Sequence, residues 1–397
     1  MNKHQLDWAG ALMTDRNFVL WESERGEPIA ARIAIAGDFL PAGNVELRHA
    51  EGWRGATGTL APHFEDISTT FANLECAIDT SGLSARKLVG LGDIVSAPPE
   101  SLDYLRAIGS VAVGFANNHS YDFGAAGVER TRQALAGRNL ALLGAGRDMT
   151  SPPDVFVWQG PGTGGVRVGL WAAAKASHDL AQSDAEGVEP ATLPRARQAL
   201  ERMKSRGARF SIALLHAGVL RTNYPDPADV KLMDAMTDAG FDLVAASHSH
   251  RISGAKVIRS GRNRPGFCFY GLGSIVSGYI AAPIEREGII VVAGFGSGGD
   301  LASLEVRPVL LGASGFGEVP PAGTSRIILD RFRNLSGEIA DASAKRLFYR
   351  EVSQNLVGLY LRDAHAAFRE SGVPGLARKT SRIRMRHLRR LAHGFFP

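Results

Sequence analysis

The sequence predicts an α/β fold with much parallel strand pairing, and two observations support this prediction. Short apolar runs rich in Val, Ile and Phe recur along the chain and end in polar or glycine-containing corners, which is typical of strands buried on both faces. Segments with helical apolar spacing lie between these runs, and most of them end on glycine. Alternation of the two kinds of segment indicates an α/β architecture.

The expected elements follow one another along the chain. The predicted strands are ARIAIAGDF, TTFANLE, SVAVGFANNH, RVGLWAAA, FSIALLHAG, DLVAASHSH and FCFYGLGS. The predicted helices are PPESLDYLRAIG, GAAGVERTRQALAGRN, LPRARQALERMKSRG and DPADVKLMDAMTDAG. We expect three parts: an N-terminal segment over residues 1–28, a main domain over 29–312, and a C-terminal helical extension with a basic tail over 313–397.

Composition limits the class of protein. A hydrophobic content of 45% over 397 residues provides enough apolar material for a large core. Cys76 and Cys268 both lie in apolar runs, so we expect two buried thiols and no disulfide framework. The N-terminus lacks an apolar core of signal-peptide length, and no window approaches the ~20 apolar residues of a membrane span. We therefore expect a cytoplasmic protein.

The positive charge of the chain is concentrated in its last 20 residues. Seven basic residues lie there without an acid, and removing them from the net charge of +5 leaves −2 for the rest. A basic tail gives little support to a nucleic-acid enzyme, so no nucleic acid is expected as a partner. The tail also has apolar residues at helical spacing, which allows peripheral contact with an anionic membrane or polymer, or packing on its own domain.

Ligand-type side chains follow five of the predicted strands. In open α/β sheets, ligands gather at the carboxyl ends of strands, where loops converge. The residues at these corners are Asp38, Glu75, Asn118 with His119, His216, and His248 with His250. Carboxylate, amide and imidazole groups together suit a borderline metal such as Mn, Fe or Zn. The recurrence predicts one shared site that holds one or two divalent ions.

These corners resemble a known family. The motifs GDFLPAG, NLE, ANNHSYDFG, LLHAG, DAGFDLVAASHSH and YGLGS, in this order, look like those of bacterial capsule-synthesis proteins of the CapA type. That family is linked to poly-γ-glutamate capsules and resembles calcineurin-like metallophosphoesterases. The resemblance spans about residues 30–295. It implies a metallophosphoesterase-like α/β/β/α sandwich of two mixed sheets flanked by helices.

The resemblance also implies roles for the corner residues. Asp38 and His250 would hold one metal ion, Glu75 would bridge, and Asn118, His216 and His248 would hold the second. His119 would be the general acid or would stabilise the transition state. Asp122 would orient His119 or cap the loop.

Four further residues are predicted to bind substrate. Asn117 lies in the same corner as His119, and Ser274 lies in the late motif LGSI. His178 and Asp179 follow another predicted strand and are expected to reach the same rim, although a simple polar loop is an alternative.

The chain departs from the family pattern at several places. Gly43 stands where an arginine usually ends the first motif, and the histidine motifs read HAG and SHSH. Ordinary metallophosphoesterases begin with DxH, whereas this chain has Asp38-Phe39-Leu40, so the first metal site would lack one ligand. Such losses around a retained ligand set suggest an altered substrate or weaker metal binding.

Three functions are compatible with the sequence. The first is metal-dependent hydrolysis or transfer on a phosphoester or on an anionic amide-linked polymer or peptide, such as a capsule polymer. The second is metal-free epimerisation of a peptide by abstraction of an α-proton. The third is a non-catalytic role in a capsule-polymer synthase, with capsule-synthesis proteins as partners.

Overall fold

The computed structural model describes residues 17–23, 26–43, 45, 52–85, 94–160, 165–175, 179–259, 264–280, 282–341 and 343–355. The predicted basic tail and His178 lie outside these ranges. None of the helices within the described ranges has the length and apolarity needed to span a bilayer.

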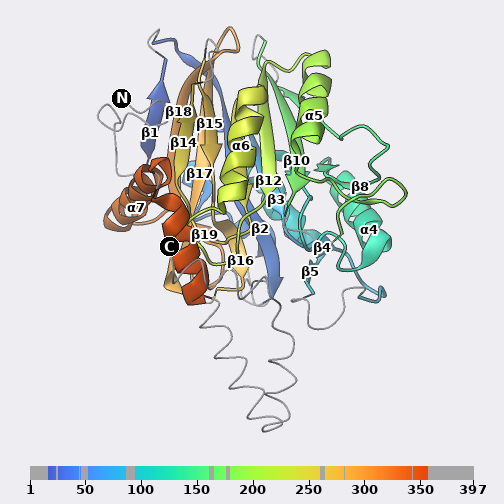
Figure 1. The fold of residues 1–397 in the computed structure, drawn as a ribbon. Helices are drawn as coiled ribbons and strands as arrows, with labels where there is room; N and C mark the ends of the chain where they lie inside the picture. The colour runs from blue at the N-terminus through green and yellow to red at the C-terminus, as the bar shows by residue number, and fades with distance from the viewer. Residues whose placement is uncertain are drawn as a thin grey trace.

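Two mixed β-sheets form the centre of the fold (Figure 1). The first runs in the order β1 (Phe18–Glu22), β18 (Leu301–Leu311), β17 (Glu287–Gly296), β2 (Ile29–Gly43), β3 (Thr69–Leu74), β6 (Ser110–Gly114) and β7 (Ala141–Leu143). β16 (Ser274–Gly278) pairs with β2, and β19 (Gly317–Glu318) pairs with β18. Pairing is parallel from β2 through β7 and antiparallel on the β17 side.

The second sheet has parallel strands in its middle and antiparallel strands at its edges. Its order is β14 (Ala255–Ile258), β15 (Gly266–Phe269), β13 (Leu243–Ser247), β12 (Phe210–His216), β10 (Arg167–Ala174) and β9 (Phe156–Gln159). Two small pairs lie apart from it: β8 (Ala145–Arg147) with β11 (Gly187–Val188), and β4 (Ala77–Ile78) with β5 (Ser96–Ala97).

Helices cover the outer faces of the two sheets (Figure 1). They are α2 (Gly52–Gly55), α3 (Leu102–Ala107), α4 (Gly124–Ala136), α5 (Leu193–Ser205), α6 (Pro227–Ala239), α7 (Ala322–Ala340) and a helix over 344–355, with short 3-10 turns at Ala61–His63, Pro99–Ser101 and Pro283–Arg286. α3 and α4 contact strands of the first sheet, and α5 and α6 contact the second. The predicted α/β/β/α sandwich is confirmed.

Helix boundaries follow local chemistry. α5 begins after Thr192, whose side chain accepts from the Arg195 N–H, and α6 begins after Asp226, whose side chain accepts from the Ala228 N–H. Such caps satisfy backbone donors that a first helical turn leaves unpaired. α6 ends at Gly240, which has φ of +128° and so adopts a conformation that favours glycine.

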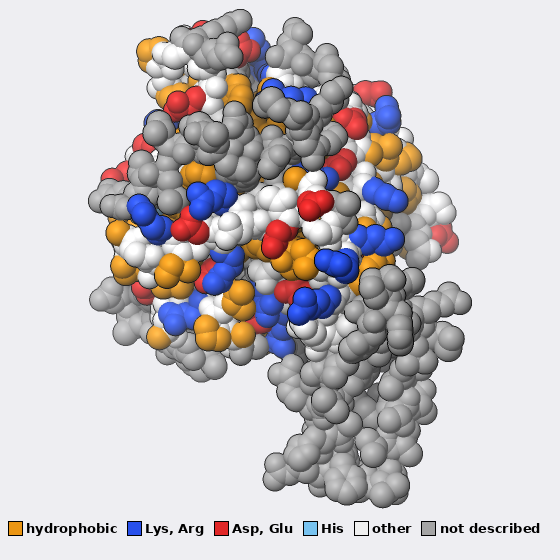
Figure 2. All heavy atoms as spheres, turned by 60° about the vertical axis from the view of Figure 1, so that its left-hand side comes forward, with side chains coloured by type: hydrophobic (Ala, Val, Ile, Leu, Met, Phe, Trp, Pro, Cys, Tyr) orange, Lys and Arg blue, Asp and Glu red, His pale blue; other side chains and the backbone are white. Residues whose placement is uncertain are grey.

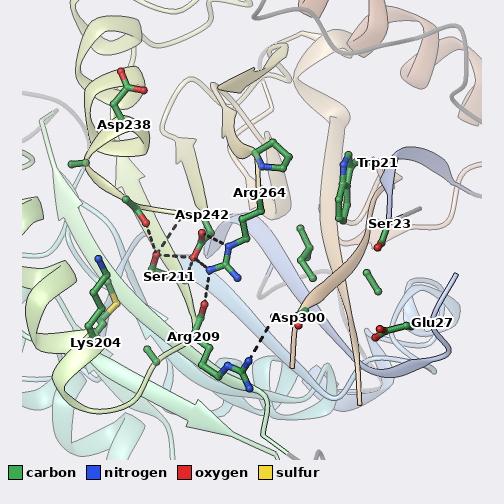
Figure 3. A pocket seen from close by; sticks show the side chains of 17 residues that line it. Trp21, Ser23, Glu27, Lys204, Arg209, Ser211, Asp238, Asp242, Arg264 and Asp300 are labelled. Atoms are coloured by element: carbon green, nitrogen blue, oxygen red, sulfur yellow. Dashed lines mark hydrogen bonds and ion pairs between the residues drawn. The ribbon is translucent and has the colours of Figure 1, made fainter. Parts of the chain in front are cut away.

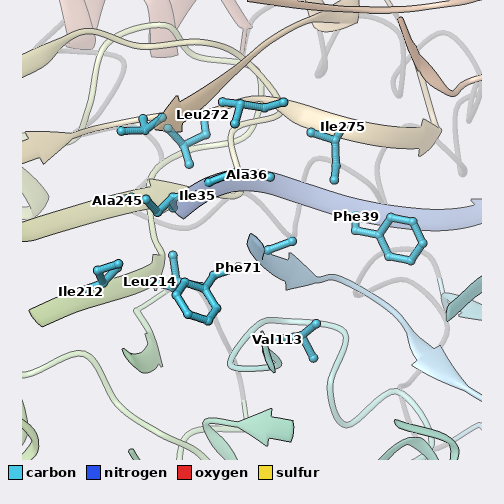
Figure 4. Packing of buried hydrophobic residues seen from close by; sticks show 14 of the residues in the cluster. Ile35, Ala36, Phe39, Phe71, Val113, Ile212, Leu214, Ala245, Leu272 and Ile275 are labelled. Atoms are coloured by element: carbon cyan, nitrogen blue, oxygen red, sulfur yellow. The ribbon is translucent and has the colours of Figure 1, made fainter. Parts of the chain in front are cut away.

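The main hydrophobic core lies between the two sheets. Phe71 and Val113 come from the first sheet and Ile212, Leu214 and Ala245 from the second, and all are buried in one cluster (Figure 4). A second cluster lies between the second sheet and helices α5 and α6. This double-sided burial explains why the strands of the second sheet read as continuous apolar runs.

The C-terminal helix α7 packs against β14 and β18. Arg331 forms an ion pair with Glu287 of β17, and Arg333 pairs with Asp330 at 2.8 Å. On the face seen in Figure 2, basic and acidic side chains are intermingled. β1, which precedes residue 29, pairs with β18 in the first sheet. The proposed division at residues 28 and 312 stays a prediction.

Gly37 allows a close approach that positions Asp38. A Cβ atom on Gly37 would lie 2.0 Å from the carbonyl oxygen of Gly273, which accepts from the Asp38 N–H at 3.0 Å. We expect Gly37→Ala to reduce the free energy of unfolding by about 3 kcal/mol, because backbone must move to relieve the contact. The control is Gly298→Ala, where a Cβ meets nothing within 4 Å. Equal urea midpoints for the two variants would contradict this reading.

Candidate metal centre

Strand register brings the five predicted corners to one edge of the sandwich. In the first sheet, Asp38 of β2 is aligned with Asn73 of β3, and Glu75 directly follows β3. In the second sheet, His216 ends β12 opposite Ser247 of β13. The corners after β6 and β13 supply the remaining residues, Asn118 with His119 and His248 with His250. The structure therefore gathers the predicted ligand-type residues at one edge of the sandwich. Asp38 does not follow its strand as expected, because β2 continues to Gly43; the other residues end or follow their strands.

Glu75 lies at the centre of this group and is completely buried. Its Oε1 lies 3.3 Å from Nε2 of His216 and 3.9 Å from Nδ1 of His248. Its Oε2 lies 3.7 Å from Nε2 of His250. One carboxylate is thus shared between imidazoles of two different corners.

Two sets of possible ligand atoms share Glu75. One set is Glu75, His216 and His248, and the other is Asp38, Glu75 and His250; the atoms of each set lie within 4.8 Å of one another. Asn118 adds an amide oxygen to the first set, since its Oδ1 is 2.6 Å from Nε2 of His216. These sets match the grouping that the family resemblance implied. The assignment of roles stays a proposal.

Asp38 links the second set to the backbone of the SHSH corner. Its Oδ2 accepts from the His248 N–H at 3.1 Å and lies 3.4 Å from Nδ1 of His250. Its Oδ1 accepts from Nδ2 of Asn73 at 2.7 Å. The predicted substrate residue Ser274 is buried, and its Oγ is 3.2 Å from Nδ1 of His250. Ser274 therefore contacts a candidate ligand directly.

The SHSH corner has an unusual backbone. His248 and His250 have φ of +113° and +53°, in a region that non-glycine residues rarely adopt. Such strain persists where the surrounding structure imposes it and clusters at functional sites. In this conformation the imidazoles of His248 and His250 both lie within 4 Å of the Glu75 carboxylate.

The buried charges act strongly on one another. Burial, together with the neighbouring His216, lowers the pKa of His248 to about 4. Burial also lowers the pKa of His250, but the charges of Glu75 and Asp38 outweigh it and raise the value to about 9. Burial raises the pKa of Glu75, yet His250 and His216 outweigh it and hold the value well below its ordinary range.

The donor atoms fit a bound cation. Both carboxylate oxygens of Glu75 and Nδ1 of His248 are buried without a hydrogen bond of good geometry among the described residues. Buried polar atoms are rarely left in this state, because desolvating them without a partner costs free energy. A divalent ion would satisfy these atoms, and O/N donor sets of this kind suit Mn, Fe or Zn.

His119 and Asp122 form a pair at the rim. Nδ1 of His119 is 2.8 Å from Oδ2 of Asp122, and the Asp122 side chain is almost fully buried whereas His119 is partly exposed. The same Oδ2 accepts from the Val95 N–H at 2.8 Å. Asp122 thus engages Nδ1 of His119 and does not occupy its Nε2.

Asn117 has a different environment from the predicted one. It is fully buried, its Nδ2 donates to the Leu74 carbonyl at 2.7 Å, and its Oδ1 accepts from the His119 N–H at 3.0 Å. Both ends of the amide are therefore engaged within the protein. This arrangement favours holding the His119 corner in place over direct contact with a substrate.

Of the other two predicted substrate residues, only Asp179 is described. It is exposed, and its carbonyl accepts from the Val188 N–H at 2.8 Å. His178 lies outside the described residues.

Asn73 is a site residue that the sequence analysis missed. Its Nδ2 donates to Asp38 and lies 3.3 Å from Nδ1 of His216, and its Oδ1 accepts from Asn117. It therefore connects both candidate ligand sets with the His119 corner. The signal was present in TTFANLE, because an asparagine two residues before Glu75 faces the same side of an otherwise apolar strand.

A cleft of about 900 Å³ lies at the opposite end of the strands (Figure 3). It is lined by Ser211, near the start of β12, so it is roughly 15–20 Å along that strand from His216. Arg264 in this cleft pairs with Asp242 at 2.8 Å, and Ser211 also donates to Asp242. These mutually paired charges distinguish the cleft from the unsatisfied donor atoms around Glu75.

Comparison with known proteins gives a family match. The model described as "Bacterial capsule synthesis protein PGA_cap" matches residues 32–279. The capsule biosynthesis protein CapA of Bacillus anthracis is 28% identical over 187 residues, which are 46% of this chain and 44% of that protein. The "Probable polyglutamine synthesis accessory protein" of Mycobacterium tuberculosis is 28% identical over 239 residues, 57% of this chain and 60% of that protein. Each match covers less than two thirds of the relative.

Solved structures show partial similarity. A 5'-nucleotidase precursor from Thermus thermophilus has a TM-score of 0.43 and 12% identity, over 77% of this chain and 58% of that one. The calcineurin-like phosphoesterase YfkN from Bacillus subtilis has a TM-score of 0.42 and 11% identity, over 79% of this chain and 99% of that one. Similarity at this level leaves the reaction of the present chain open.

Proposed function

The chain belongs to the bacterial capsule synthesis protein family PGA_cap, and on this premise we propose that it is a metal-dependent hydrolase or transferase. The main support is the buried Glu75, which is shared by two sets of ligand atoms and has two unsatisfied oxygens among the described residues. Three imidazoles lie within 4 Å of these oxygens, but none makes a hydrogen bond of good geometry with them, which is unusual for a buried carboxylate.

The two ligand sets would hold the ions. Asp38, Glu75 and His250 form one set; Glu75, Asn118, His216 and His248 form the other. A divalent metal held there supplies Lewis acidity toward a phosphoryl or carbonyl oxygen and lowers the pKa of water. Asn73 and Ser274 would hold Asp38 and His250 in position, since side chains that contact ligands fix their orientation.

His119 would donate the proton that the leaving group needs. The buried Asp122 engages Nδ1 of the ring, so Nε2 would be the nitrogen that transfers the proton. A histidine fixed in this way can protonate a departing oxygen or nitrogen in the transition state. In this proposal, the ions held by Glu75 and its neighbours would stabilise the charge of the transition state, and His119 would transfer the proton.

We assign the substrate to the class of phosphoesters or anionic amide-linked polymers and peptides. Support comes from the relatives, whose names refer to capsule, PGA or polyglutamine synthesis. The direct experiment compares hydrolysis of a chromogenic phosphodiester and of a γ-linked glutamyl peptide with and without Mn²⁺. Full activity in chelator would refute the proposal, and α-deuterium uptake from deuterated water in chelator would indicate epimerisation instead.

Removal of single ligands is expected to abolish activity with the fold retained. Asn118→Ala and His216→Ala should each weaken metal binding by at least about 100-fold, because even partners outside the ligand shell contribute 10–100-fold. His63→Gln is the matched control, since this buried histidine contacts the Pro308 carbonyl at 2.8 Å instead of the site. Full activity in either ligand variant would rule out the assignment.

Metal binding should also stabilise the folded chain. At a free Mn²⁺ concentration of 100 times Kd, the expected gain in unfolding free energy is about 2.7 kcal/mol, because the ion binds the folded state. Thermal unfolding with Mn²⁺ and then with excess chelator measures this gain and its reversal. The same midpoint in both conditions would argue against a built metal site.

A further inference from the structure

Arg221 lies beside the SHSH corner in the fold, although the two are far apart in the sequence. It follows His216 by five residues, on the loop between β12 and α6. Its backbone N–H donates to the carbonyl of Ser249 at 2.9 Å, and Ser249 stands between His248 and His250. The loop that leaves one candidate ligand is thus joined to the corner that carries two others.

The backbone of Arg221 is strained. Its φ is +63°, and among the described residues five non-glycine residues have positive φ, three of which are Arg221, His248 and His250. A left-handed arginine is disfavoured by its Cβ atom and persists only where other contacts impose it. Those contacts are the Ser249 carbonyl and Nδ2 of Asn355, which donates to the Arg221 carbonyl at 2.8 Å.

The side chain of Arg221 forms an ion pair through Nε and is partly exposed to solvent. Its Nε lies 3.3 Å from Oε1 of Glu285, whose side chain is 3% exposed, whereas the Arg221 side chain is 44% exposed. Within the described residues, the two terminal nitrogens of Arg221 have no hydrogen bond. A guanidinium held through Nε by a buried carboxylate presents its planar fork for bidentate contact with an oxyanion.

An ordinary surface ion pair would look different. Arg130 of α4 has the same 44% exposure, but its terminal Nη1 contacts Asp79 at 3.2 Å, and that carboxylate is itself 36% exposed. Exposed pairs of that kind contribute little to stability. Arg221 differs in its buried partner, in its own left-handed backbone and in its terminal nitrogens, which have no hydrogen bond among the described residues.

We propose that Arg221 binds an oxyanion of the substrate, a carboxylate or a phosphate, beside the His248 and His250 corner. This inference rests on the proposed function, because it takes the metal centre as the place where chemistry occurs. A bidentate contact there would hold an anionic group next to the reacting bond. Binding energy of this kind positions the bond for attack.

The helix over residues 344–355, which follows α7, would hold Arg221 in position. Besides Asn355, it supplies Glu351, whose Oε2 accepts from the Asn223 N–H at 2.8 Å and whose Oε1 is 3.3 Å from Nη1 of Arg251. Glu351 therefore ties the Arg221 loop to the residue after His250. This helix lies outside residues 32–279, which match the family model.

The test uses the strained backbone. Arg221→Gly removes the guanidinium and suits the positive φ, whereas Arg221→Met removes the charge and keeps a side chain; urea unfolding checks that both variants are folded. Binding of inorganic phosphate and of a γ-linked triglutamate peptide is measured by calorimetry on full-length, metal-loaded and chelated protein. We expect binding of at least one probe to weaken about tenfold or more in Arg221→Gly and Arg221→Met, and to stay unchanged in Arg130→Met.

The two probes separate the sources of the oxyanion. An effect on phosphate alone indicates a phosphoester, and an effect on the peptide alone indicates a carboxylate. Parental affinity for both probes in both Arg221 variants, or no binding of either probe to the parent, would overturn the inference. Metal content measured on the same samples keeps the two proposals apart, because a chain without metal refutes the metal centre while Arg221-dependent anion binding stays measurable.

Discussion

Replacing Glu75 with glutamine should remove bound metal and lower activity by about 1000-fold or more. Glu75 belongs to both ligand sets, so one substitution weakens both. Loss of Lewis-acid stabilisation costs several kcal/mol in the transition state, and each 1.36 kcal/mol is a factor of ten in rate. Metal analysis after dialysis and steady-state kinetics on the same sample measure the two effects.

A second buried glutamate gives the control for this variant. Glu189 is also buried, but it is paired with Arg195 through two contacts, at 2.6 and 2.7 Å. Glu189→Gln should lower stability and leave the metal content per chain unchanged. If Glu75→Gln retained metal and rate while Glu189→Gln lost them, the role given to Glu75 would be wrong.

Replacing His119 with glutamine should lower the rate by about 10²–10⁴-fold and leave metal binding intact. The effect is that of a general acid, and His119 belongs to neither set of ligand atoms. Substrates whose leaving group needs no proton should lose much less, because they leave as stable anions. Rates for a good and a poor leaving group, with metal content, measure this selectivity.

Asp122→Asn tests whether the pair works as a unit. Asp122 contacts His119 at 2.8 Å, so the variant should lose part of the His119 effect, about tenfold or more, with the same dependence on leaving group. An equal loss on both kinds of leaving group would show that His119 contributes by binding or structure and not by proton transfer.

The sequence predicted the fold and the meeting of the corners well, for a physical reason. Parallel strands buried on both faces are largely apolar, so Asp38, Glu75, His216 and the histidines of SHSH stand out from the apolar runs. Carboxyl ends of parallel strands share one edge, so these residues had to meet once the strands paired in that direction.

Features that depend on contacts distant in sequence were not predictable in this way. Asn73 gained its role from Asp38, His216 and Asn117, which come from three other segments. From the sequence, the side-chain amide of Asn117 was expected to bind substrate, but in the structure it donates a hydrogen bond to the Leu74 carbonyl. Glu285 and Asn355 reach Arg221 from residues 64 and 134 positions later, and no local pattern indicates such pairs.

The central claim is that a metal centre forms around Glu75, and one measurement tests it most directly. Crystals of the full chain grown with excess Mn²⁺ would be measured at a wavelength where Mn scatters anomalously. We predict anomalous peaks within coordination distance of Glu75, with His216 and His248 or Asp38 and His250 as further ligands. A map at full Mn²⁺ excess with no peak beside Glu75 would contradict the claim.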